Sequence, residues 1–174
     1  MSENKIFDFT LVYQLPKDSP AAEDHIDALF DAGCDDAIPG TGKMGRIALE
    51  FAREAGNAAS ALNSAKKNVE AAIPDARLME VRPDIVGASE IADLAKCSRQ
   101  YVRNQLGKID GLALPVYAAS GHTLWHLSVL NHYLTQETTL SIPRHIYEFS
   151  EIAMKTNSAI QSALLAAQLE RDII

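Results

Sequence analysis

Residues 85–108 read IVGASEIADLAKCSRQYVRNQLGK, and this stretch decides the fold of the middle of the chain. Ser89 stands before an apolar run, so it is the expected N-cap of a short first helix. Ser98 and Gly107 bracket a second run of helical spacing, as its cap and its stop. Two short helices joined by a tight turn are the geometry of a helix-turn-helix, which this stretch therefore predicts.

The second predicted helix has one apolar and one polar side. Val102 and Leu106 are four residues apart and would pack on the first helix. On the other side, polar side chains at neighbouring helical positions could reach base edges and phosphates in a major groove. Of these, Arg99, Gln100 and Arg103 are the expected base readers. With the flanking turn and hairpin, the residues expected to contact DNA are Lys96, Ser98, Arg99, Gln100, Tyr101, Arg103, Asn104, Lys108 and His122.

The distribution of charge singles out the same stretch. The 174-residue chain has a net charge of −7, which argues against a protein that coats nucleic acid non-specifically. Residues 1–84 carry 9 basic and 15 acidic side chains, whereas residues 85–134 carry 4 basic and 3 acidic side chains. From Lys96 to Lys108 there are four basic residues and no acidic residue. A local basic face on an acidic protein is typical of a site-selective DNA reader.

The segment after the two helices predicts a β-hairpin. Residues 114–117 and 123–125 are strand-like, and Ser120-Gly121-His122 would form the polar tip between them. A helix would then begin near Ser128. Together with the two helices, this hairpin would complete a small domain over residues 85–136.

This region resembles the helix-turn-helix of the excisionase- and MerR-like winged-helix families, through residues 88–92 (ASEIA) and 98–102 (SRQYV). More broadly, residues 29–37 (LFDAGCDDA), the second helix and residues 124–125 are similar to a group of bacterial helix-turn-helix regulators with a small N-terminal domain. The resemblance covers about residues 5–134. It implies a hairpin wing beside the phosphate backbone, and double-stranded DNA as the partner.

Residues 1–84 predict a separate α+β domain. Its strands and helices are expected in the order β-α-β-β-α-β. The expected elements are strand 6–13, helix 23–32, strands 34–38 and 46–51, helix 57–73 and strand 78–81. This order is typical of a ferredoxin-like sandwich, in which two helices cover one face of an antiparallel sheet. That fold hosts unrelated activities, so a small-molecule effector and subunit pairing both stay open.

Residues 137–174 predict a helical C-terminal segment. Between 144 and 174 there is no Gly or Pro, and apolar residues recur at intervals of three and four. Either one long helix or two helices broken near 156–158 would follow. A helix with this many apolar residues needs a partner surface to cover them. We expect this surface to be the same helix of a second subunit rather than the N-terminal domain. A homodimer also suits the two half-sites of a palindromic DNA sequence.

Several motifs of other functions are rejected by their spacing. Residues 40–43 (GTGK) lack the upstream Gly and the following Ser or Thr of a phosphate-binding loop, so we expect a hairpin turn. Cys34 and Cys97 are 63 positions apart and are expected to be buried free thiols. His122 and His126 are four residues apart, but a strand there argues against a metal pair. No catalytic, metal or cofactor site is expected.

These observations predict a cytoplasmic, homodimeric transcriptional regulator that binds a specific DNA sequence and is not an enzyme. The N-terminus lacks a basic segment followed by an apolar run, and no uncharged run approaches the roughly 20 residues that span a bilayer, so no membrane association is expected. The alternative is a protein-interaction module, such as an antitoxin or an assembly adaptor, in which the helix-turn-helix is either only a scaffold or autoregulates the operon.

Overall fold

The computed structural model describes residues 4–109, 111–112 and 114–171, and these form an α+β fold. Outside the described residues lie 1–3, 110, 113 and 172–174. The predicted N-terminal domain therefore loses its first three residues from this description, and the predicted C-terminal segment its last three. The chain divides into two compact units: the first runs to Arg82 and resumes at Lys155, and the second is Pro83–Met154. No helix of the described residues is long and apolar enough to cross a membrane.

The first unit is built on a four-stranded antiparallel sheet with the strand order β2-β3-β1-β4. Its strands are β1 (Lys5–Gln14), β2 (Ala37–Gly40), β3 (Arg46–Ala55) and β4 (Arg77–Arg82). The helical elements are a 3-10 turn, η1 (Ala22–His25), and the helices α1 (Ile26–Asp31) and α2 (Ala58–Ala72). These elements follow the order predicted from the sequence.

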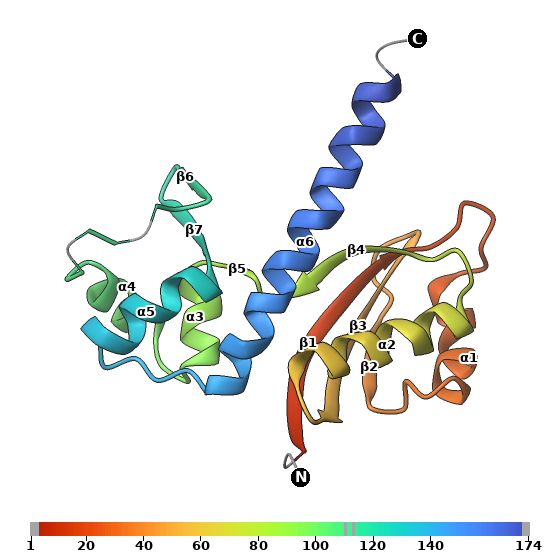
Figure 1. Cartoon of the computed structure of the whole chain (residues 1–174), viewed down its shortest axis with the longest axis horizontal. Coiled ribbons are helices and arrows are strands. Elements are labelled where there is room, and N and C mark those ends of the chain that lie inside the picture. Colours follow the sequence, from red (N-terminus) through yellow and green to blue (C-terminus); the bar gives the residue numbers. More distant parts are fainter. Residues whose placement is uncertain (1–3, 110, 113, 172–174) are drawn as a thin grey trace. The chain divides into compact units, whose positions relative to one another are not determined.

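One face of this sheet is buried and the other is open. In β1, Phe7, Phe9 and Leu11 are buried while the residues between them are exposed or half-buried, because successive side chains of a strand point to opposite faces. Leu49 and Phe51 of β3 lie opposite Leu11 and Phe9 and extend the same buried face. The helix α2 packs across this face, and α1 packs beside α2 (Figure 1).

The predicted strand 34–38 begins three residues late, because the chain before it binds a buried arginine. Arg53 of β3 is only 7% exposed, and its guanidinium donates to the two carboxylate oxygens of Asp36 at 2.7 and 2.8 Å. It also donates to the carbonyl oxygen of Gly33 at 2.7 Å and to Oδ1 of Asn68 at 2.6 Å. A buried charge needs such partners, so this part of the chain turns around Arg53 instead of extending as a strand.

Among the described residues, the second unit contains three short helices, a small sheet and the start of the last helix. Strand β5 (Ile85–Val86) is followed by α3 (Ala88–Leu94) and α4 (Arg99–Leu106). The hairpin β6 (Tyr117–Ala119) and β7 (His122–His126) comes next, and then α5 (Leu127–Glu137) and α6 (Arg144–Arg171). Antiparallel pairing gives the strand order β5-β7-β6.

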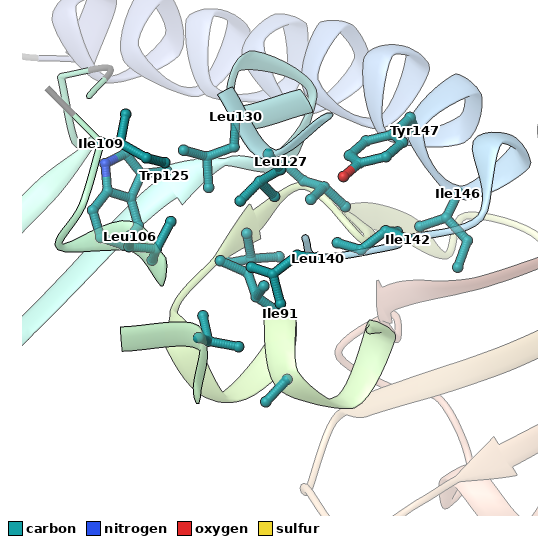
Figure 2. Close-up of a cluster of buried hydrophobic side chains, with 14 residues drawn as sticks. Ile91, Leu106, Ile109, Trp125, Leu127, Leu130, Leu140, Ile142, Ile146 and Tyr147 are labelled. Atoms are coloured by element: carbon teal, nitrogen blue, oxygen red, sulfur yellow. The ribbon is translucent and has the colours of Figure 1, made fainter. Parts of the chain in front are cut away.

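The predicted separate segment 137–174 is divided between the two units, and the boundary falls inside α6. Leu140 and Tyr147 are buried and lie with Ile91 of α3 in one apolar cluster (Figure 2). The start of α6 therefore belongs to the core of the second unit, since its apolar side completes the burial of α3 and α5. The helix α6 is continuous, without the break near 156–158 that was one of the two predicted alternatives.

Within the first unit, α6 supplies a polar cap to the edge of the sheet. Strand β4 lies at this edge, so a residue such as Val81 has no neighbouring strand on its outer side. Asn157 of α6 accepts a hydrogen bond from the Val81 N–H with Oδ1 and donates to the Val81 carbonyl with Nδ2, both at 2.8 Å. One side-chain amide thus replaces the missing strand at this residue.

Candidate nucleic-acid interface

The start of α3 is set by a glycine and a glutamate. Gly87 is the N-cap, and Oε2 of Glu90 accepts a hydrogen bond from its N–H at 3.0 Å. A Cβ atom at Gly87 would meet Leu124 at 3.1 Å and the carbonyl oxygen of Thr123 at 3.4 Å. The prediction that Ser89 caps this helix is therefore wrong, because β7 approaches the helix start closely and Glu90 already satisfies the cap N–H.

The turn between α3 and α4 directs the second helix. Lys96 has a left-handed backbone with φ of 52°, and the Cys97 N–H donates to the Ala92 carbonyl at 2.9 Å. Ser98 then caps α4, since its hydroxyl oxygen accepts from the Tyr101 N–H at 3.2 Å. The predicted cap at Ser98 is confirmed, and α4 begins at the next residue.

Helix α4 has the two sides that its sequence predicts. Val102 and Leu106 are buried in the core of the second unit, where Leu106 lies near Trp125 (Figure 2). The side turned away from this core carries polar residues only, and all of them are exposed. We call this set the α4 face; it consists of Arg99, Gln100, Arg103 and Asn104.

The positive charges of the α4 face are not neutralised. No carboxylate pairs with Arg99 or Arg103 within residues 4–109, 111–112 and 114–171. Nη2 of Arg103 donates to the carbonyl oxygen of Gly121 at 3.4 Å, a long hydrogen bond, and Nε2 of Gln100 donates to Oδ1 of Asn104 at 3.0 Å. Each guanidinium carries five N–H donors, so most of them remain available to a ligand.

A cleft of about 400 Å³ lies between α4 and the hairpin. Ser120 and Gly121 at the hairpin tip have φ angles of 50° and 80°, as a tight two-residue turn requires. This turn directs β7 back along the cleft. The charged and titratable side chains that line the cleft are Glu90, Arg99, Arg103 and His122, so the cleft is basic on balance.

The hairpin itself carries no formal positive charge. The sequence has no Lys or Arg between Lys108 and Arg144, and His122 is exposed on β7. Contact between the hairpin and a phosphate would therefore depend on His122, hydroxyl groups and backbone N–H groups. The hairpin and its approach instead expose apolar side chains, such as Leu114 at 93% and Tyr117 at 53%.

The other residues predicted to contact DNA lie at the borders of the α4 face. Lys96 in the turn before α4 and Lys108 just after it are exposed, so one lysine stands at each end of the helix. The hydroxyl of Tyr101 forms a 2.5 Å hydrogen bond with Oγ1 of Thr139. This bond ties α4 to the segment before α6, and the Tyr101 hydroxyl is used within the unit.

Sequence reasoning missed the hydrogen bond between Asp84 and His126 that anchors the hairpin. Asp84 is only 2% exposed, and its Oδ1 lies 2.6 Å from Nδ1 of His126. The Asp84 carbonyl also accepts from the Leu127 N–H at 2.7 Å. No local sequence signal connects positions 84 and 126, because the pairing of β5 with β7 brings them together. The described residues include no group of three or more His, Cys, Asp and Glu side chains that could hold a metal ion.

No protein family model, curated protein or solved structure matches this chain. The α4 face, the adjoining cleft and the two flanking lysines are the features of the described residues that bear on its function.

Proposed function

We propose that this protein is a transcriptional regulator that binds a specific sequence of double-stranded DNA and acts by binding rather than by catalysis. The observation that carries the proposal is the α4 face, which exposes two arginines and two amides. An arginine fork matches O6 and N7 of guanine, and a side-chain amide matches N6 and N7 of adenine. One helix side with both groups is suited to reading base edges in a major groove.

We assign the second unit to the winged helix-turn-helix folds. The order β5-α3-α4-β6-β7 and the sheet β5-β7-β6 support this assignment, because a wing requires a hairpin beside the recognition helix. The resemblance of residues 88–102 to excisionase- and MerR-like proteins belongs to the same proposal. We also assign the first unit to the ferredoxin-like sandwiches, which the antiparallel order β2-β3-β1-β4 supports.

Each residue at the interface has a role in this proposal. Arg99, Gln100 and Arg103 contact bases, and the hydrogen bond between Gln100 and Asn104 holds these two amides in place before binding. Tyr101 is a positioning residue that acts through its hydrogen bond to the loop before α6. The phosphate contacts are Lys96, Ser98, Lys108 and, from the hairpin, His122.

We place a homodimer contact on the last turns of α6. Leu165 and Leu169 are 62% and 55% exposed there, and no charged residue lies between Lys155 and Glu170. A second copy of the same helix fits such a surface without like-charge repulsion, and a two-fold dimer presents two α4 helices to a palindromic site. Leu165→Glu should produce monomers in sedimentation velocity, whereas Ala163→Glu, at an exposed position on another side of the helix, should leave the dimer intact.

The experiment that tests DNA binding is selection of a bound sequence from random duplex DNA by the full chain, followed by titration of variants. Arg103→Ala should weaken binding to the selected site by about 1–3 kcal/mol, which is roughly 5- to 150-fold. Arg77→Ala, at an exposed arginine of β4 outside the interface, is the matched control and should bind as tightly as the unchanged chain. Failure to enrich any sequence, or full affinity in a variant lacking both Arg99 and Arg103, would contradict the proposal.

A second candidate is a protein-interaction module such as an antitoxin or an assembly adaptor. The exposed apolar side chains of the uncharged hairpin favour it, because contiguous apolar surface marks protein contacts. Leu114→Ser combined with Tyr117→Ser should then abolish co-purification of a stoichiometric protein partner. If the same double variant retains its partner, or if no partner is found, this candidate is rejected.

A further inference from the structure

The open face of the first unit's sheet carries a hollow that the proposed DNA binding does not use. The strand registers place Gly40, Ala48, Val12 and Glu80 in one row that crosses the sheet from β2 to β4. This row lines a cavity of about 380 Å³ on the face opposite to α2. The volume falls within the range of small-molecule sites, about 300–1,000 Å³.

The hollow exists because the middle of this row is small. Gly40 and Ala48 are register partners on neighbouring strands. A Cβ atom at Gly40 would lie 3.7 Å from the Cβ of Ala48, which is an ordinary contact, so the backbone does not require glycine there. The missing side chain leaves open space above the sheet, and Val12 and Ala48 give this space an apolar floor.

Basic side chains from three segments line the hollow. They are Lys43 from the β2–β3 turn, Arg46 at the start of β3 and Arg82 at the end of β4. Of the described residues that line it, only Glu80 is acidic, and Arg82 holds this carboxylate with hydrogen bonds of 2.7 and 2.9 Å. In the part of the chain that the structure describes, no carboxylate pairs with Lys43 or Arg46. Two unpaired positive charges therefore meet at one cavity.

We propose that this hollow binds a small organic anion, either a carboxylate or a phosphate ester. The Arg46 guanidinium can hold such a group with two parallel hydrogen bonds, and Lys43 adds a second charge. The apolar part of the ligand packs on Val12 and Ala48. The GTGK turn is thus no phosphate-binding loop of the usual kind, yet its lysine contributes to an anion site. The proposal concerns the first unit alone and does not depend on DNA binding by the second.

DNA phosphates share this chemistry, but the concave shape and the apolar floor favour a small molecule. Mixed polar and apolar lining is typical of pockets that enclose most of a small ligand, whereas a duplex backbone is contacted mainly through its phosphates.

The test is titration of the ¹⁵N-labelled full chain with citrate and with inorganic pyrophosphate at constant ionic strength. Saturable shifts are expected for the amides of Gly40 and Gly42, which lie at the cavity. Arg46→Gln combined with Lys43→Gln should weaken binding by more than roughly tenfold, because the loss of even one charge-assisted hydrogen bond weakens binding by about that factor. Ala48→Ile should block the hollow. Ala52→Ile, four residues from Ala48 on the same face of β3 and outside the cavity, is the matched control and should bind normally.

Three results would overturn the proposal: shifts that grow linearly without saturation for both anions, equal affinity in the doubly substituted variant, or shifts at this site caused by a random DNA duplex but by neither anion. The last result would assign the surface to nucleic acid. Because the α4 face lies elsewhere in the chain, Arg103→Ala should leave anion binding unchanged, so failure of this proposal and failure of the DNA-binding proposal can be told apart.

Discussion

Replacing Asn157 with alanine should lower the free energy of unfolding of the first unit, because one side chain there satisfies two backbone groups. Asn157 makes two hydrogen bonds of 2.8 Å with Val81, which is fully buried at the edge of the sheet. At about 0.5–1.5 kcal/mol of net stability each, the two bonds contribute about 1–3 kcal/mol. The better helix propensity of alanine returns roughly 0.6 kcal/mol within α6. The expected loss is therefore about 0.5–2.5 kcal/mol.

Urea unfolding of the full chain measures this loss, and hydrogen exchange of the Val81 amide locates it. The amide should exchange faster in Asn157→Ala, because the side chain that accepts its hydrogen bond on the outer side of β4 is removed. Asn157→Asp retains an acceptor for the N–H but no donor for the carbonyl, so it should protect the amide and still destabilise the unit. Ser158→Ala, at the exposed neighbouring position, is the control. Unchanged exchange of Val81 in Asn157→Ala would refute the reasoning.

Three further predictions concern buried groups. Arg53→Lys should lower the free energy of unfolding, measured in urea, by about 2–4 kcal/mol, because a lysine ammonium cannot replace a buried guanidinium that binds four partners at once. Arg77→Lys, at the surface, is the control and should change the free energy of unfolding little. Tyr147→Phe should raise the unfolding free energy by up to about 1 kcal/mol, since the Tyr147 hydroxyl is buried with no hydrogen-bond partner among the described residues. Burial also raises the pKa of Tyr147 from 10 to about 12, so this hydroxyl ionises at a lower pH in the unfolded chain than in the folded one. The free energy of unfolding should therefore be independent of this group below pH 10 and should fall as the pH rises to about 12, and Tyr147→Phe should flatten that decline in urea titrations across this range. The two free cysteines should differ in their rate of alkylation near pH 8. Burial raises the pKa of the Cys34 thiol, so Cys97 should react first. Equal rates of alkylation would contradict the buried position of Cys34.

Patterns within single elements predicted much of the secondary structure. The alternation of Phe7, Phe9 and Leu11 predicts a half-buried strand wherever it lies, and β1 extends only one residue beyond the prediction at each end. Ser98 predicted the start of α4, because a cap bonds to an N–H only three residues away. Such signals depend on neighbours along the chain and therefore survive in any tertiary arrangement.

The α4 face was predictable for the same reason. Residues three and four apart share a helix side, so Arg99 and Arg103 had to be neighbours once α4 formed. That no carboxylate of the described residues pairs with them was not predictable, since any distant acidic side chain could have reached them. The start of α3 was not predictable either, because the approach of β7 to Gly87 involves residues far along the chain.

The sequence by itself determined the order of strands and helices in residues 5–82, the buried sides of β1 and α4, and the concentration of basic residues around α4. Only the tertiary structure decided that the chain before β2 turns around Arg53, that Leu140 and Tyr147 complete the core of the second unit, and that Asn157 covers an open strand edge. The physical reason is range. Periodicity and capping arise between residues a few positions apart, whereas a buried charge, a core or a strand edge is satisfied by whichever distant group the folded chain brings within bonding distance.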